Sequence, residues 1–424
     1  MRAAFYESDI TPPLGGYMTG YYRERRAEDV YEKLFAKALV VEDNGNFAAI
    51  VAIDACLMTD EIHDVVTKRI YEYTGIKPEC VSVSATHTHK GIPITDSPAI
   101  NCFADKAYVD VCYRLVADAV ILAYKRLGDE EVEISYGSDI VTGLAFNRDS
   151  VLIDGTHETA IPRNCDEVLR PLGEVDESFN IVTFSKGGKK IGAIVNYSLH
   201  LDTSLPNMAY CGDYAAIISE ILKEEYGYDF VSLFVTGACG NVNHINHDIN
   251  IPLLNHRQIG AILGKEAIRI IGNSEPVKGG VSVCKELVTI EKRQPNDEAF
   301  KKFFHRKTGE VNKVMMSAYL YYLNSNKEIH KDFFIQAIKI GDVAFSILPG
   351  EIYTTIGLAI KRKSPYSKTI IIELANTATG YIPNKEVFGE NCWLYESLLC
   401  EGSCLVPEAS EIIKEKALEL LNKI

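Results

Sequence analysis

Three pairs of strand-like segments, each joined by a short turn, constrain the fold of this chain most strongly. The pairs are 34–41 with 47–53, 179–184 with 191–197, and 334–340 with 343–348. Their turns contain Asn44-Gly45, Gly187-Gly188 and Gly341-Asp342, and such dipeptides are typical of hairpins. Because hairpin strands are antiparallel, the pairs argue against a strict Rossmann or TIM-barrel arrangement.

Segments with helical spacing alternate with these strands. The longest runs from Ala107 to Leu127 and repeats apolar residues at helical intervals. Helices are expected at 60–73, 107–127, 215–226, 259–271, 298–323 and 408–421, and further strands at 80–84, 230–235 and 281–290. No internal repeat or linker is visible. The chain is therefore expected to be a single large α/β domain over residues 1–424, with mixed β-sheets flanked by helices.

The composition excludes some classes of partner. Lys and Arg total 44 against 58 Asp and Glu, so the formal charge is −14, which argues against nucleic acid and anionic membranes. No segment approaches the ~18–20 consecutive apolar residues of a transmembrane helix. The N-terminus lacks a signal-peptide pattern, and the 11 cysteines have no disulfide-like spacing. These features predict a cytoplasmic protein with reduced thiols, and they give no indication of its oligomeric state.

The sharpest local motif is Ser84-Ala-Thr-His87-Thr-His89-Lys-Gly91, at the end of the predicted strand 80–84. Residues two apart on an extended chain project to the same side, so His87 and His89 can converge on one centre. Taken alone, the motif is compatible with a metal site and equally with two hydrogen-bonded loop histidines.

Two further donors follow apolar strands elsewhere in the chain. His200 ends the segment 194–200, and Glu351 follows Leu348-Pro349-Gly350. Either one alone fits a buried histidine or a helix-dipole partner. Together with His87, they make the His, His and carboxylate set of an open catalytic zinc site.

With these motifs in order, the sequence resembles the neutral/alkaline (non-lysosomal) ceramidase family over most of the family's catalytic domain. The stretches that carry the resemblance are Asp9-Ile-Thr-Pro12 with Met18-Thr-Gly20-Tyr21, Thr86-His87-Thr88-His89 with Gly91, Asn147-Arg148, His200, Pro349-Gly350-Glu351 with Thr354-Thr355, Asn376-Thr-Ala-Thr-Gly-Tyr381, and Tyr395-Glu396. The resemblance implies a catalytic domain without the family's C-terminal immunoglobulin-like domain.

Residue by residue, the resemblance also implies a site. Zinc would be bound by His87, His200, Glu351 and Tyr381. A zinc-bound water has its pKa lowered towards ~7 and supplies a nucleophile at neutral pH.

Three further residues would assist the reaction: His89 would help move the proton, Tyr395 would donate to the oxyanion, and Arg148 would face a carbonyl or carboxylate. The implied activity is zinc-dependent hydrolysis of a linear amide bond, or an ester, in a small N-acyl substrate.

The sequence departs from the family at two positions near this site. Asn243 stands where the family has a serine in a Gly-[Asn/Asp]-x-Ser-Pro-Asn stretch, and an amide can hydrogen-bond a substrate or oxyanion but cannot act as an alkoxide. Lys90 replaces a small residue after the two histidines and would place a cation at the mouth of the site. We therefore expect retained hydrolysis with a substrate other than ceramide.

Three alternatives remain open from the sequence. Cys239 could act as a thiol nucleophile with His244 or His247 as its base. These two histidines could instead shape the pocket or hold a second metal. The chain could also be a metal-binding protein that has lost turnover. Cys392, Cys400 and Cys404 fit no standard zinc spacing and are expected to be buried thiols.

Overall fold

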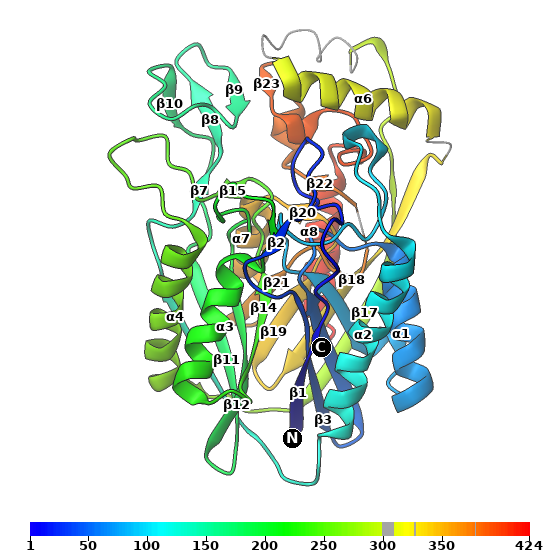
Figure 1. Ribbon diagram of the computed structural model, residues 1–424, viewed down its shortest axis with the longest axis vertical. Coiled ribbons are helices and arrows are strands. Elements are labelled where there is room, and N and C mark those ends of the chain that lie inside the picture. The colour runs from blue at the N-terminus through cyan, green and yellow to red at the C-terminus, as the bar shows by residue number, and fades with distance from the viewer. Residues whose placement is uncertain (299–308, 326–327, 378) are drawn as a thin grey trace.

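The computed structural model describes residues 1–298, 309–325, 328–377 and 379–424, and in this part of the chain three units of one design surround a shared core (Figure 1). Each unit has three antiparallel strands, a helix that leads to a fourth strand parallel to the third, and a second helix. Unit 1 consists of β1 (Arg2–Asp9), β3 (Phe35–Asp43), β4 (Asn46–Ile53), α1 (Asp60–Thr74), β5 (Val81–Ala85) and α2 (Lys106–Lys125).

Units 2 and 3 repeat this order. Unit 2 consists of β6 (Glu133–Ile140), β11 (Ser178–Lys186), β12 (Lys189–Tyr197), α3 (Asp213–Tyr226), β14 (Val231–Thr236) and α4 (His256–Gly272), with β16 (Glu275–Pro276) added beside β6. Unit 3 consists of β17 (Val281–Glu291), β18 (His330–Ile340), β19 (Val343–Ile347), α7 (Thr354–Lys363), β21 (Lys368–Ile372) and α8 (Ala409–Leu421). The sequence showed no repeat, so the repetition lies in the topology.

Short elements connect and cover the units. They are the parallel pair β2 (Asp29–Val30) and β13 (Ala209–Tyr210), the antiparallel pair β7 (Phe146–Asn147) and β15 (Val242–Asn243), the parallel pair β20 (Glu351–Ile352) and β22 (Tyr381–Ile382), a small sheet of β8 (Asp149–Leu152), β9 (His157–Thr159), β10 (Val168–Pro171) and β23 (Cys392–Trp393), the helix α6 (Gly309–Ser325), and the 3₁₀ turns η1 (Pro78–Cys80), η2 (Pro98–Ile100), η3 (Lys385–Phe388) and η4 (Tyr395–Ser397).

The alternation of side chains along the strands explains how the three sheets pack. Leu39 and Ile50 of unit 1, Leu233 of unit 2, and Phe345 and Ile370 of unit 3 lie in one central cluster with no more than 1% exposure. Since successive residues of a strand point to opposite faces, the neighbouring residues cover the outer face of each sheet. Full burial of each large apolar side chain contributes about 1.5–3 kcal/mol, so the shared core holds the units together.

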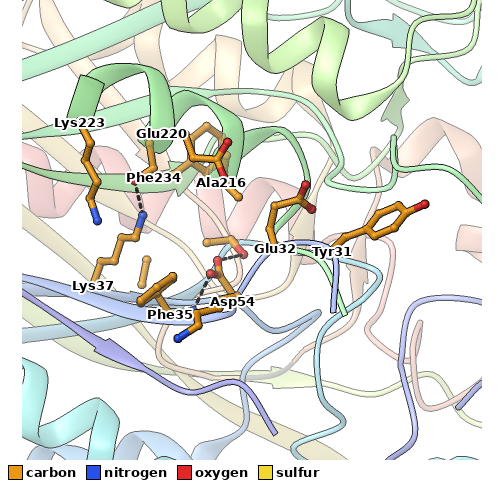
Figure 2. Close-up of a pocket in the computed structure, with 14 residues that line it drawn as sticks. Tyr31, Glu32, Phe35, Lys37, Asp54, Ala216, Glu220, Lys223 and Phe234 are labelled. Carbon is orange, nitrogen blue, oxygen red and sulfur yellow. Dashed lines mark hydrogen bonds between the residues drawn. The ribbon is translucent and has the colours of Figure 1, made fainter. Parts of the chain in front are cut away.

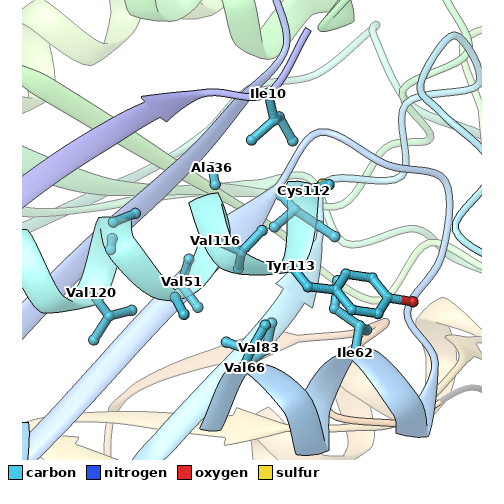
Figure 3. Close-up of a cluster of buried hydrophobic side chains, with 14 of the residues drawn as sticks. Ile10, Ala36, Val51, Ile62, Val66, Val83, Cys112, Tyr113, Val116 and Val120 are labelled. Carbon is cyan, nitrogen blue, oxygen red and sulfur yellow. The ribbon is translucent and has the colours of Figure 1, made fainter. Parts of the chain in front are cut away.

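Helices cover each outer face. In unit 1, Val66 of α1 and Val116 of α2 pack against Val51 and Val83 of the sheet (Figure 3). In unit 2, α3 and α4 cover the sheet on the opposite side of the molecule from α1 and α2 (Figure 1). None of the described helices is both long and apolar enough to cross a membrane.

The fourth strands of the three units, β5, β14 and β21, meet at their carboxyl ends. Thr236, the last residue of β14, donates its hydroxyl to the carbonyl of Thr86, which follows β5, at 2.7 Å. The Glu373 amide after β21 donates to the Thr236 carbonyl at 3.0 Å, and Ala375 forms a bridge with Ser84. The loops that follow these strands are therefore brought to one place.

The predicted fold class is confirmed, as are the three hairpins. At the first turn, Asn44 and Gly45 both have positive φ angles, as a tight hairpin requires. The helix predicted at 298–323 is observed from Gly309 as α6, and residues 299–308 lie outside the described part of the chain. The strands β1, β6 and β21 were not predicted as strands; pairing with β3, β11 and β19 stabilises them.

Candidate metal centre

Three donor side chains leave the carboxyl ends of strands in the three units. His87 follows β5, His200 follows β12 and Glu351 follows β19. His87 has φ 72°, a conformation that costs a non-glycine residue of order 1–3 kcal/mol and is kept only where the surroundings fix it. Gly350, before Glu351, has φ 69°, and a Cβ there would lie 2.3 Å from the Gly380 carbonyl oxygen.

The three side chains converge on Glu351 Oε2. This atom lies 3.3 Å from His87 Nε2 and 3.4 Å from His200 Nε2, and all three side chains are largely buried. In the part of the chain that the structure describes, this oxygen has no hydrogen-bond partner. A tetrahedral zinc with bonds of ~2.0–2.2 Å separates its ligand atoms by roughly 3.3–3.6 Å. The donor set and its spacing therefore fit a zinc ion.

Neighbouring groups orient both imidazoles. His87 Nδ1 lies 2.5 Å from the Cys56 carbonyl oxygen, which makes Nδ1 the protonated nitrogen and leaves the Nε2 lone pair facing Glu351. His200 Nδ1 lies 3.4 Å from Cys239 Sγ, and this thiol donates to Glu373 Oε1 at 3.0 Å. Both rings thus present Nε2 to the same point.

The charges within the cluster are strongly coupled. Burial disfavours ionisation of Glu351, but His87 and His200 outweigh this effect and hold the pKa of the carboxyl well below its usual range. Burial also opposes the charged form of His87, and Glu351 outweighs it, so the pKa of this imidazole is raised. Burial and the neighbouring His87 lower the pKa of His200 to about 3.

Tyr381 lies beside Glu351 because β20 and β22 pair in parallel with these two residues in register. The Glu351 amide donates to the Gly380 carbonyl at 2.9 Å. In-register residues of parallel strands project to the same side, so the Tyr381 side chain is directed to the same side as the Glu351 carboxyl. Burial first, and then Glu351, raise the pKa of Tyr381 well above its usual value.

Arg148 stands behind the cluster and is buried. Its Nε donates to Glu396 Oε1 at 3.0 Å, its Nη2 donates to the Gly240 carbonyl at 2.7 Å, and its Nη1 lies 3.2 Å from His200 Nε2. The guanidinium also lies 5.1 Å from the ring centre of Tyr395. The structure therefore brings Arg148 and Tyr395 to the candidate centre. It also adds Glu396, which the sequence analysis noted only as the residue after Tyr395.

His89 completes the same group. Its Nε2 lies 3.4 Å from His87 Nε2, and its Nδ1 lies 3.6 Å from Asp202 Oδ2. Burial and then the neighbouring His87 lower the pKa of His89 well below its usual value. Burial raises the pKa of Asp202 to about 7. Asp202 follows His200 by two residues and was missed, because nothing in its local sequence marks it.

A cavity of about 340 Å³ opens beside the cluster. Its lining includes donor and polar groups of the candidate centre, His87, His89, Glu351, Tyr381 and Tyr395. Most of the remaining wall is apolar or aromatic and comes from Tyr21, Tyr22, Leu57, Ile92, Ile94, Met315, Ala318 and Tyr321. An apolar cavity with polar groups at one end is the usual form of a small-molecule site.

Two residues that the sequence placed at the site have other contacts. The Asn243 amide oxygen accepts the Ile245 backbone N–H at 2.9 Å, and Asn243 is absent from the described lining of the cavity. Lys90 is buried, and its ammonium is held by the Leu205 carbonyl and the Asn207 side chain. The expectation of a free cation at the mouth was therefore wrong, because the loop after His200 captures it.

The other histidines and cysteines that the sequence offered as metal donors do not form a metal centre in the described part of the chain. His247 Nε2 lies 2.8 Å from Ser150 Oγ, and His244 Nδ1 lies 3.8 Å from Asp202 Oδ1. Among the described residues, neither histidine and none of Cys392, Cys400 and Cys404 belongs to a group of converging metal donors. No disulfide joins any of the described cysteines.

Comparisons with known proteins agree with this architecture. A model of the neutral/alkaline non-lysosomal ceramidase N-terminal region matches residues 5–244, more than half of the chain. The fold is similar to the crystal structure of neutral ceramidase from Pseudomonas aeruginosa, with a TM-score of 0.74 and 18% identity over 99% of this chain and 74% of that one. A ceramidase complexed with C2 is similar at a TM-score of 0.75, also with 18% identity and the same shares. No curated protein sequence matches significantly.

Proposed function

This chain belongs to the neutral/alkaline non-lysosomal ceramidase family, and from that premise we propose that it is a zinc-dependent hydrolase of an amide bond in a small N-acyl compound. The observation that carries the proposal is the convergence of His87 Nε2 and His200 Nε2 on a Glu351 oxygen that has no hydrogen-bond partner among the described residues. His87, His200, Glu351 and Tyr381 would hold the zinc ion, and the ion would supply an activated water and Lewis acidity.

The residues around the ion have separate tasks. Tyr395 lines the cavity and donates a hydrogen bond from its phenol O–H to the carbonyl oxygen as that oxygen gains charge. Burial raises the pKa of Tyr395 well above its usual value, which keeps this proton on the phenol. Arg148 orients Tyr395 and His200 through its contacts with both, and Glu396 fixes the guanidinium.

His89 moves the proton. It lines the cavity, and its Nε2 lies 3.4 Å from His87 Nε2, so it is placed to accept the proton lost by the nucleophile. Its other nitrogen faces Asp202, which stabilises the imidazolium that forms. The proton then passes to the leaving amine, which restores neutral His89.

The cavity favours a lipid-like acyl group. Its wall is mostly apolar, and its volume of about 340 Å³ lies near the lower end of small-molecule sites, which run from ~300 to 1,000 Å³. Together with Asn243 in place of the family serine, this size favours an N-acyl substrate smaller than ceramide. An ester of the same acyl group fits the same site.

The test combines two measurements. The first is an anomalous-scattering map recorded at the zinc edge, and the second is the rate of hydrolysis of N-acyl amines with acyl chains of increasing length. We expect anomalous density between His87, His200 and Glu351, and faster hydrolysis of short N-acyl amines than of ceramide. Asn243→Ala is the matched variant, because its amide caps a local turn, and it should retain zinc. Bound zinc without hydrolysis of any amide or ester would support the alternative of a metal-binding protein that has lost turnover. Absence of anomalous density between His87, His200 and Glu351 would refute the proposal.

A thiol mechanism at Cys239 has less support. The thiol is fully buried and donates to Glu373, and burial followed by that carboxyl raises its pKa well above its usual value. A nucleophilic cysteine requires the thiolate and access to substrate, and Cys239 is absent from the described lining of the cavity.

A further inference from the structure

A second group of metal-binding side chains lies outside the proposed active site. Glu32, Cys211 and His256 are all buried, and their donor atoms lie within 4.8 Å of one another. Glu32 precedes β3 of unit 1, whereas Cys211 and His256 come from unit 2. Nothing in the proposed hydrolysis uses this cluster.

Local structure fixes all three side chains. Glu32 and Cys211 follow the parallel pair β2 and β13, and the Tyr31 amide donates to the Tyr210 carbonyl at 2.8 Å, which places the next residues of the two segments side by side. His256 is the first residue of α4, and its ring stacks on Tyr31 with the centres 6.4 Å apart. The cluster is therefore a rigid arrangement formed where two units meet.

The ring nitrogens of His256 are buried without hydrogen bonds. The side chain is 0% exposed, and within the described part of the chain neither nitrogen has a hydrogen-bond partner. Its Nε2 lies 3.5 Å from Glu32 Oε1, beyond the usual range of an N–H···O bond but close to the spacing of two ligands on one tetrahedral zinc, roughly 3.3–3.8 Å. Cys211 Sγ lies 2.7 Å from the other oxygen of Glu32. A buried polar ring without a partner is costly, and a metal ion between the three groups would remove that cost.

The donors also select the metal and balance its charge. Calcium and magnesium take oxygen ligands, whereas sulfur, imidazole and carboxylate together suit zinc. Binding releases the thiol proton of Cys211 to solvent. The glutamate and the thiolate then neutralise the divalent ion, and Arg257 continues to pair with Glu32 Oε1 at 2.7 Å.

We propose that Glu32, Cys211 and His256 bind a zinc ion at the junction of units 1 and 2. Glu32 lines a cavity of about 360 Å³, which supplies water for the fourth position. Figure 2 shows Glu32 and Tyr31 at one end of this cavity, and Lys37 and Lys223 at the other.

The ion would stabilise the segments that carry the catalytic histidines. The Cys211 carbonyl accepts the Thr88 hydroxyl at 2.6 Å, and the Cys211 amide donates to the Lys90 carbonyl at 3.3 Å. The His256 amide donates to the Thr203 carbonyl at 3.0 Å, three residues after His200. An ion that bridges Cys211 and His256 would therefore connect the His87–His89 segment to the segment that follows His200.

Zinc content provides the first test. Purified protein loaded with zinc and dialysed should hold about two ions per chain, and Cys211→Ala and His256→Ala about one. Cys112→Ala is the matched control, because Cys112 is as buried as Cys211 and belongs to neither cluster. It should keep both ions. Equal zinc content in Cys211→Ala and the unmodified chain would overturn the proposal.

Cobalt separates this site from the catalytic one. With Co²⁺ in place of zinc, the unmodified chain and His200→Ala should both show a thiolate-to-cobalt charge-transfer band, and Cys211→Ala should lack it. A band that persists in Cys211→Ala would assign the thiolate elsewhere and refute the site. If the proposed active site holds no metal, His200→Ala will match the unmodified chain in zinc content while Cys211→Ala still loses an ion.

A third measurement uses the unmodified chain, so the test does not depend on whether the variants fold. Zinc should protect Cys211 from alkylation, as read by peptide mass spectrometry, relative to the same protein stripped of metal. Equal labelling of Cys211 with and without zinc would contradict the proposal.

Discussion

The cluster of His87, His200 and Glu351 and the cluster of Glu32, Cys211 and His256 are built by similar means. Each lies beside a parallel pair of two-residue strands, β20 with β22 in the first and β2 with β13 in the second. Each joins donors from units that are distant in the sequence. The first faces a mostly apolar cavity with Arg148 and Tyr395 nearby, whereas the second contains a thiol, and its Glu32 faces a cavity whose lining includes lysines and carboxylates. The comparison teaches that the groups around a donor cluster, more than the donors, decide whether it suits catalysis.

The largest expected effect separates the two clusters directly. His200→Ala should lower hydrolysis by on the order of 10³-fold or more, because the catalytic ion and its activated water are lost. The ion at Cys211 should remain. Steady-state kinetics together with zinc content per chain will check both, and a variant that keeps its activity would remove His200 from the catalytic site.

The two arginines that pair with buried glutamates provide the next contrast. Arg148 is 7% exposed beside Glu396, and Arg257 is 61% exposed beside Glu32. Arg148→Met should lower the free energy of unfolding by about 3–5 kcal/mol, because it leaves a buried carboxylate without its charge partner. Arg257→Met should cost about 1 kcal/mol or less, because solvent screens its charge.

Denaturant titrations of both variants measure this difference. Equal losses would show that the two carboxylates have similar surroundings, which would break the comparison between the clusters.

Tyr381→Phe addresses a smaller effect within the first cluster. It removes one proposed ligand oxygen and keeps the ring, so activity and zinc affinity should fall by about 10–100-fold. Competition with a zinc-binding dye measures the affinity, and kinetics the activity. Unchanged zinc affinity would make Tyr381 a substrate-facing residue. Tyr319→Phe serves as the control, because Tyr319 is buried and absent from the described lining of both cavities.

The smallest effect is expected at Cys239. Because its thiol is buried against Glu373, Cys239→Ser should change hydrolysis by no more than about threefold, whereas loss of a nucleophile would abolish it. Thiol alkylation in the presence of zinc should likewise leave activity intact. Inactivation by either treatment would favour the thiol mechanism.

Much of the local structure could be predicted because it is specified by residues close together in the chain. The turn at Asn44-Gly45 and the alternating strands beside it fix a hairpin whatever surrounds them. The same locality made His87 and His89 visible as a motif. The role of Glu373 could not be predicted in this way, since its contacts with Cys239 and Ile352 come from strands brought together only by folding.

The sequence by itself determined the hairpins, the helix periods and the order of the motifs, because turn chemistry and apolar spacing act over a few residues. The tertiary structure alone decided that three units share one topology around one core, and that Glu32 meets Cys211 across 179 residues of chain. Such long-range contacts depend on how the buried faces of the sheets and helices pack. The residues around a position in a single sequence do not indicate which distant residue it will contact.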